Sequence, residues 1–203
     1  MLTNLNQYMS YMCVISRSTR FILLRTLQNE NVGASARAIK NIGFHALSLV
    51  NPHDLGVLCR DKVVHRASGA TDILKNAMVF TSLEEAVDGC DIICGTGMPI
   101  DMYRKRRERV YLEPRQYFET LNHPNDVVND SITNDRSTND RRLSIAFVFG
   151  SETTGMTEEE MDHCQVMLGI PTNPKFGSLN LASAVQLIAY DWRMALGGRH
   201  SYF

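Results

Sequence analysis

Three short segments combine glycines with polar side chains, and each directly follows a run of apolar residues. They are residues 95–99, 150–155 and 171–180. Ligands of open parallel sheets bind at the loops that leave the carboxyl ends of the strands, so these segments are the candidates for a binding site. We expect Gly150 to let a ligand approach the backbone closely, because glycine has no Cβ.

The middle segment is close to a phosphate-binding loop. Residues 150–157 match G-x-x-x-x-G-K-[ST], except that Met156 occupies the lysine position. Without this cation, and with Glu152 inside the loop to repel phosphate, the pattern disfavours a nucleoside triphosphatase. A plain strand-to-helix turn with two glycines is the alternative interpretation.

The third segment leads into a predicted helix over residues 179–196. Ser178 lies at the expected N-cap and Asn180 in the first turn, so both side chains could serve only as caps. Further along, apolar residues recur at helical spacing, which indicates core packing or a subunit interface. They are Leu181, Ala184, Val185, Ile188 and Trp192.

Basic residues occur in two places. Arg37 and Lys40 share one face of a predicted helix over residues 32–42, which opens with small residues and ends at Gly43. A basic run follows the first glycine segment, and its members are Arg104, Lys105, Arg106, Arg107 and Arg109. Either set could bind a polyanion, or each could be a solvated surface.

Alternating strand and helix patterns predict an α/β fold, in which a mostly parallel sheet carries helices on both faces. The expected strands are residues 21–24, 46–50, 79–80, 91–94, 144–149 and 166–170. The expected helices, besides the two above, are residues 54–60, a segment from Ser82, and residues 157–163 after the capping box Thr157-x-x-Glu160.

The 203 residues suit one domain. We expect a loosely held N-terminal extension over residues 1–18 and a domain over residues 19–203. Within it, residues 122–142 repeat Asn-Asp four times with few apolar residues, which predicts a mobile surface insertion.

Composition excludes several classes of protein. The net charge is -1, and the basic excess lies in residues 1–66 and 101–115. Five cysteines without a C-x-x-C pair predict a reducing compartment, so we expect a cytoplasmic protein. The scattered histidines and cysteines do not favour a metal site, and no apolar run is long enough to span a membrane.

Taken together, three motifs resemble those of the SpoU/TrmH-type RNA 2′-O-ribose methyltransferases of the SPOUT superfamily. They are Asn31-x-Gly33-Ala34-x-x-Arg37, Phe149-Gly150-x-Glu152-x-x-Gly155-Met156 and Ile170-Pro171-x-Asn173-Pro174-x-x-x-Ser178-Leu179-Asn180-Leu181. Asn173-Pro174 and the segment Ile188-Ala189-Tyr190 most resemble the TrmJ branch, which methylates tRNA in the anticodon loop.

The resemblance implies a trefoil-knotted α/β domain, a homodimer with a shared site, and S-adenosyl-L-methionine as methyl donor with S-adenosyl-L-homocysteine as product. Positions that match the cofactor contacts of the family are Thr96, Gly97, Met98, Gly150, Ile170, Gly177, Ser178 and Leu179. Positions that match its catalytic motifs are Arg37, Asn31, Glu152, Ser178 and Asn180. No metal is implied.

The resemblance also assigns the basic side chains to RNA: Arg37, Lys40, Arg104, Lys105, Arg106, Arg107 and Arg109. An arginine cannot act as a free base at neutral pH, so Arg37 is expected to hold a phosphate or stabilise an alkoxide. Two alternatives stay open, namely methylation of ribosomal RNA and an RNA-binding paralogue without catalysis.

Overall fold

The computed structural model describes residues 18–98, 109–121 and 143–198. Residues 1–17 of the predicted N-terminal extension, the Asn-Asp insertion and residues 104–107 of the basic run lie outside these ranges. Among the described helices, none has the length and apolar character needed to cross a membrane.

The described strands form one all-parallel sheet in the order β3-β2-β1-β6-β4-β7-β5, which confirms the predicted α/β class. The strands are β1 (Thr19–Leu24), β2 (Ala46–Val50), β3 (Met78–Phe80), β4 (Ile92–Gly97), β5 (Tyr111–Leu112), β6 (Ile145–Phe149) and β7 (Val166–Gly169). The predicted strands all occur, with ends at most three residues from the predicted ones. The central strands β1, β2 and β6 follow their apolar runs because these runs are buried, whereas the edge strand β3 is largely exposed. The trefoil knot stays a prediction.

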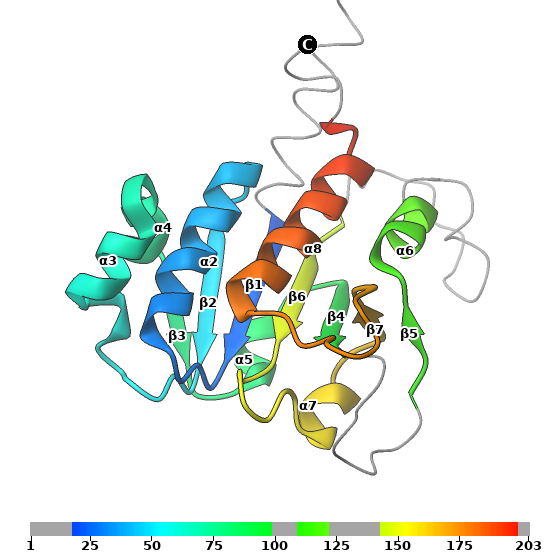
Figure 1. The fold of residues 1–203 in the computed structure, drawn as a ribbon, viewed down its shortest axis with the longest axis horizontal. Helices are drawn as coiled ribbons and strands as arrows, with labels where there is room; N and C mark the ends of the chain where they lie inside the picture. Colours follow the sequence, from blue (N-terminus) through cyan, green and yellow to red (C-terminus); the bar gives the residue numbers. More distant parts are fainter. Residues whose placement is uncertain (1–17, 99–108, 122–142, 199–203) are drawn as a thin grey trace, which may run out of the picture.

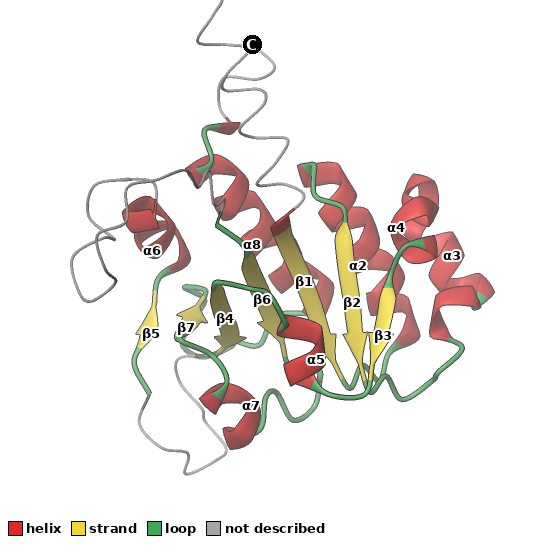
Figure 2. Ribbon diagram, turned by 180° about the vertical axis from the view of Figure 1, so that it is seen from behind, coloured by secondary structure: helices red, strands yellow, loops and turns green. Residues whose placement is uncertain are grey.

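Helices cover both faces of the sheet (Figures 1 and 2). One face carries α2 (Asn29–Ile42), α3 (Asp61–Ala67), α4 (Thr71–Lys75), α6 (Pro114–Leu121) and α8 (Leu181–Ala195). The other face carries α5 (Leu83–Val87) and α7 (Glu158–Asp162). Two short 3₁₀ turns, η1 (Val57–Cys59) and η2 (Ser68–Ala70), flank α3.

Aromatic packing fixes α8 on the sheet. The ring of Phe118 lies 5.2 Å from that of Trp192, and the ring of Phe147 lies 6.0 Å from it, both edge to face. The indole N–H of Trp192 donates to Thr19 Oγ1 at 3.0 Å, so this polar atom is satisfied in the core. Between the two alternatives for the apolar stripe of α8, the structure shows core packing.

The helix α2 begins three residues before its expected start, and Gly43 ends it in the left-handed conformation (φ 91°), as predicted. Its small residues let another backbone approach. A Cβ on Gly33 would lie 2.2 Å from the carbonyl oxygen of Val63 in α3, so this helix pair requires glycine at that point.

Several predicted boundaries were wrong. The segment 54–60 is a 3₁₀ turn, and α3 and α4 follow it; they are too short to show a clear helical period. The strand β5 and the helix α6 were missed, because β5 has only two residues at the sheet edge. The N-cap of α8 is Asn180, whose side chain accepts from the N–H of Ala182, and not Ser178. The capping box of α7 is confirmed.

Candidate functional site

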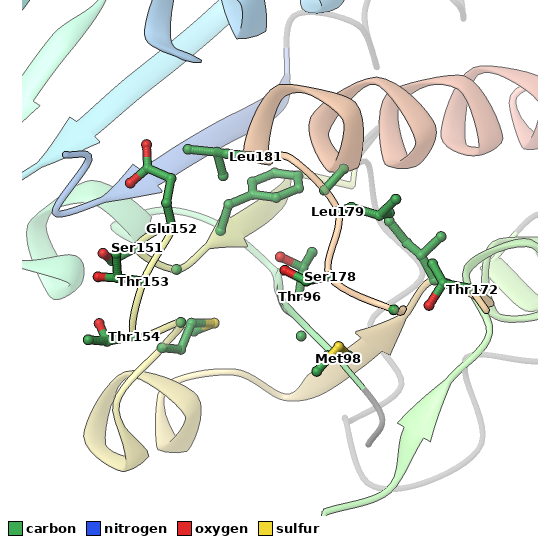
Figure 3. Close-up of a pocket in the computed structure, with 18 of the residues that line it drawn as sticks. Thr96, Met98, Ser151, Glu152, Thr153, Thr154, Thr172, Ser178, Leu179 and Leu181 are labelled. Carbon is green, nitrogen blue, oxygen red and sulfur yellow. The ribbon is translucent and has the colours of Figure 1, made fainter. Parts of the chain in front are cut away.

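A cavity of about 420 Å³ opens at the carboxyl ends of β4, β6 and β7 (Figure 3). Three loops surround it, and they are the segments that the sequence singled out. In Figure 3, Thr96 and Ser178 lie across the cavity from the hydroxyl side chains of Ser151, Thr153 and Thr154. The adjacent strands of the parallel sheet bring these loops together, because β4 pairs with both β6 and β7.

All eight positions that match the cofactor contacts of the resemblance line this cavity. The lining also includes residues that the sequence reasoning missed, among them Tyr111, Phe149, Thr153 and Thr154. Tyr111 belongs to the short strand β5, which no pattern revealed. Thr153 and Thr154 stood inside a recognised motif, but at its variable positions.

The loop after β6 is closed on itself. Ser151 and Gly155 exchange backbone hydrogen bonds of 3.2 and 2.8 Å. A Cβ on Gly150 would lie 2.3 Å from the carbonyl carbon of Gly155 and the nitrogen of Met156. The structural need for glycine at this position is therefore closure of the loop, whereas the sequence suggested ligand approach.

Polar residues from all three motifs form one hydrogen-bond network. Asn31 donates to Glu152 Oε1 at 2.9 Å and accepts from Asn180 Nδ2 at 2.9 Å. Asn180 in turn caps α8. Both ends of the buried Asn31 amide are thus bonded within the chain, so Asn31 positions its neighbours.

Glu152 closes this network at the start of α2. Its carboxylate accepts from the backbone N–H groups of Leu27 and Gln28 at 3.0 and 3.3 Å. The first N–H groups of a helix lack partners within the helix and favour a negative charge, and the Gln28 side chain does not cap α2. Glu152 therefore fastens the loop after β6 to α2 and points away from the hydroxyl side chains of the loop (Figure 3).

Arg25 makes a second attachment of the same loop, and the sequence reasoning missed it. Its guanidinium donates to the carbonyl oxygen of Gly155 at 3.0 Å and pairs with Glu160 of α7. Arg25 follows β1 directly and has a positive φ of 46°. The sequence did contain one indication of this role, because Arg25 directly follows a predicted strand and so lies at the edge of the sheet where ligands bind.

The cavity lining is poor in charge. Of the residues that line it in the described part of the chain, Glu152 is the one charged side chain, and none is Lys or Arg. Two cysteines of the sheet and its cover, which do not line the cavity, are uncharged thiols at neutral pH, since burial raises the pKa of Cys164 to about 12 and also raises that of Cys94. The described residues contain no group of three side chains suited to a metal ion. This lining suits a ligand without phosphate groups.

Of the basic residues predicted to bind RNA, the structure describes Arg37, Lys40 and Arg109, and none of these three lines the cavity. Arg37 is exposed on α2, while Lys40 donates to Asp72 at 2.7 Å. Arg109 pairs with Glu158 and Asp162 of α7, and the hydrogen bond to Asp162 raises the pKa of its guanidinium. Within one chain, the structure thus brings together four of the five catalytic-motif residues and leaves Arg37 outside.

Fold and site together define an α/β protein with a ligand site at the carboxyl edge of a parallel sheet. Comparison with known proteins specifies the family. The sequence profile of the SpoU rRNA Methylase family matches residues 18–190, and the chain belongs to this family.

Similar proteins carry more specific names. The tRNA (cytidine/uridine/adenosine-2′-O-)-methyltransferase TrmJ of Pseudomonas aeruginosa (strain UCBPP-PA14) is 40% identical over 177 residues, which cover 87% of this chain and 60% of that protein. The TrmJ of Photorhabdus laumondii is 38% identical over 87% of this chain and 64% of that protein. The chain thus spans 60 to 64% of the length of these curated relatives.

Solved structures share the fold. The probable methyltransferase from Bordetella pertussis Tohama I superposes with a TM-score of 0.76 at 30% identity, over 91% of this chain and 99% of that one. TrmJ from Z. mobilis ZM4 superposes with a TM-score of 0.69 at 30% identity, over 87% of this chain and 69% of that one.

Proposed function

We propose that this protein transfers a methyl group from S-adenosyl-L-methionine to a ribose 2′-hydroxyl of tRNA, in the anticodon loop. One observation carries the proposal: the loops after β4, β6 and β7, from distant parts of the chain, surround a single cavity that has no cation in its described lining. The names of relatives such as the Pseudomonas aeruginosa TrmJ support the reaction and the tRNA substrate.

The lining fits the proposed cofactor. Apolar side chains of Met98, Phe149 and Leu179 offer contacts for an adenine ring, and the loop backbone offers donors and acceptors for its polar edge. A triphosphate or a dinucleotide would enter the same space without a cation to neutralise its charge. When bound, S-adenosyl-L-methionine would supply an activated methyl group on a sulfonium, with S-adenosyl-L-homocysteine as product. No metal is needed.

The chain's own groups then have two tasks, orientation of the ribose and support for its deprotonation. Ser178 presents its hydroxyl at the cavity, while Thr96, which also lines it, donates its hydroxyl to the carbonyl oxygen of Val148 at 3.0 Å. Glu152, Asn31 and Asn180 hold the loops in register. Arg37 is assigned to the substrate, where its guanidinium holds the adjacent phosphate or stabilises the developing alkoxide.

Because Arg37 does not line the cavity of its own chain, we assign its action to the cavity of a second copy. Exposed apolar side chains on the outer face of α8 support such a homodimer: Leu187 is 39% and Tyr190 is 45% exposed. A tRNA substrate also places the protein in the cytoplasm.

Mapping of ribose methylation tests the proposal. Unmodified tRNA and ribosomal RNA are incubated separately with the protein and S-adenosyl-L-methionine, and 2′-O-methylated nucleotides are located by their resistance to alkaline cleavage. We expect one methylated nucleotide in the anticodon loop. Methylation of ribosomal RNA alone would show that the substrate is ribosomal RNA and not tRNA. Cofactor binding without methylation of either RNA would favour the non-catalytic paralogue.

A further inference from the structure

A second arginine, Arg66, lies on α3, the helix that packs against α2. The close packing of α2 on α3 brings Arg66 against Gly33, because a Cβ on Gly33 would lie 2.9 Å from the Cβ of Arg66. Arg37 is one helical turn after Gly33 and therefore lies on the same face of α2. One further turn along, Lys40 donates to the carbonyl oxygen of Gly69, just after α3. The face of α2 that carries Arg37 is thus the face along which the last turn of α3 runs.

Neighbouring carboxylates do not neutralise these two arginines. Both side chains are exposed, and neither has an ion pair or hydrogen bond with another described residue. Two carboxylates on this side of the sheet are paired with lysines instead. Asp72 pairs with Lys40, and Glu30 lies 3.8 Å from Lys62. Asp61 occupies the first turn of α3, where the helix dipole favours it.

We propose that Arg66 and Arg37 together bind the phosphodiester backbone of the RNA substrate, with Arg66 extending the contact beyond the reacting nucleotide. The inference rests on the proposed function, since it names where that substrate runs. Two guanidiniums without carboxylate partners on adjoining helices repel each other, and a bound polyanion between them would remove this unfavourable electrostatic energy. Guanidinium forks also match phosphate oxygens in geometry.

Arg66 could also stabilise its own helix, and the experiment must separate this structural role from RNA binding. It lies in the last turn of α3, where a positive charge stabilises the helix end. Lys75 occupies the same kind of position in the last turn of α4 and is also exposed. Lys75→Gln is therefore a matched control for loss of one positive charge at a helix end.

The experiment measures tRNA affinity by filter binding across a series of salt concentrations, without any need for methyl transfer. We expect Arg66→Gln to weaken binding about fivefold near 0.15 M salt and to reduce the slope of log K against log salt by about 0.7, the share of one phosphate contact. Arg66→Lys should recover much of the affinity. The methylation rate at saturating tRNA should change much less than the affinity, because the proposed contact of Arg66 lies beyond the reacting nucleotide.

The outcomes separate this inference from the proposed function. Wild-type affinity and slope in Arg66→Gln would overturn the arginine pair and leave the methyltransferase proposal intact. An equal loss of tRNA affinity in Lys75→Gln would mean that Arg66 contributes only as one of many positive charges, and this result would overturn the arginine pair as well. Absence of tRNA binding by the wild-type protein would overturn both.

Discussion

At the scale of single residues, substitution of Arg37 distinguishes an effect on catalysis from an effect on cofactor binding. If it contacts the reacting ribose or its phosphate in the transition state, Arg37→Ala should lower the single-turnover rate about 100-fold, or about 3 kcal/mol. Arg37→Lys should recover only part of this, because lysine keeps the charge but loses the fork. Calorimetric affinity for S-adenosyl-L-methionine should change little.

The rate is measured at saturating RNA and cofactor, so that weakened binding does not contribute. A wild-type rate in Arg37→Ala would make this arginine a surface residue without a role in the reaction. Arg66→Gln is the control, since it removes a neighbouring charge that we assign to binding alone.

Glu152 attaches the loop after β6 to the first motif and the segment before α2. Its carboxylate accepts hydrogen bonds from Leu27, Gln28 and Asn31. Glu152→Ala leaves these donors without their partner, so the free energy of unfolding should fall by about 2 kcal/mol. Urea titration measures this, and Glu159→Ala, at an exposed position of α7 that has none of these contacts, should stay within about 0.5 kcal/mol of wild type.

A double-mutant cycle extends the test to Asn31 and Asn180. Substituting each by Ala should give a coupling free energy of about 1 kcal/mol, since the two amides share one hydrogen bond of 2.9 Å. Additive effects would mean that the motifs are held independently, and Glu152→Ala with the wild-type urea midpoint would contradict the network as a whole.

At the scale of elements, the loop after β6 depends on its attachment to β1. Arg25 bonds the Gly155 carbonyl and pairs with Glu160, which also caps α7. Arg25→Ala should free this loop and weaken cofactor affinity about tenfold, because ordering of the loop would then oppose binding.

Arg115→Ala provides the comparison. It removes an arginine–carboxylate pair between α6 and α8, where Arg115 donates to Asp191 at 2.7 Å, away from the loop. Calorimetry should show an unchanged cofactor affinity for this variant. Equal affinities in both variants would contradict a role for Arg25 in ordering the loop.

The larger elements could be predicted because their signals are local. Buried parallel strands such as β6 appear as continuous apolar runs, and α7 carries its capping box in four residues. Short elements such as β5 and α3 take their stability from neighbours, which the local pattern does not contain. The cap of α8 shows the same limit, since Ser178 and Asn180 are both good caps and only the backbone geometry selects Asn180.

The candidate site divides in the same way. Its loops were predictable, because strand order places the carboxyl ends of β4, β6 and β7 together and each loop has unusual residues. The roles of single side chains were less predictable. Gly150 serves loop closure, Arg25 joins the site through Gly155, and Tyr111 joins it through the pairing of β5 with β7, which the pattern along the chain does not contain.

At the scale of the whole molecule, we propose that a second copy completes each site, because Arg37 does not line the cavity of its own chain. A purified heterodimer of one Arg37→Ala subunit and one Ser178→Trp subunit tests this directly. The indole at position 178 would fill one cavity, while the other cavity faces the intact Arg37 of the partner. If Arg37 acts across the interface, one of the two symmetric sites survives, and the heterodimer should retain about half of the wild-type rate although each homodimer is inactive.

The reciprocal heterodimer supplies the control, because the two modes of action give opposite results. Here one subunit is wild type and the other carries both substitutions. Action across the interface leaves neither site complete, since the open cavity faces Ala at position 37, so no methylation is expected. Action within one chain would reverse both outcomes, with about half activity in this heterodimer and none in the first. A monomeric mass by light scattering with activity retained would contradict the shared site altogether.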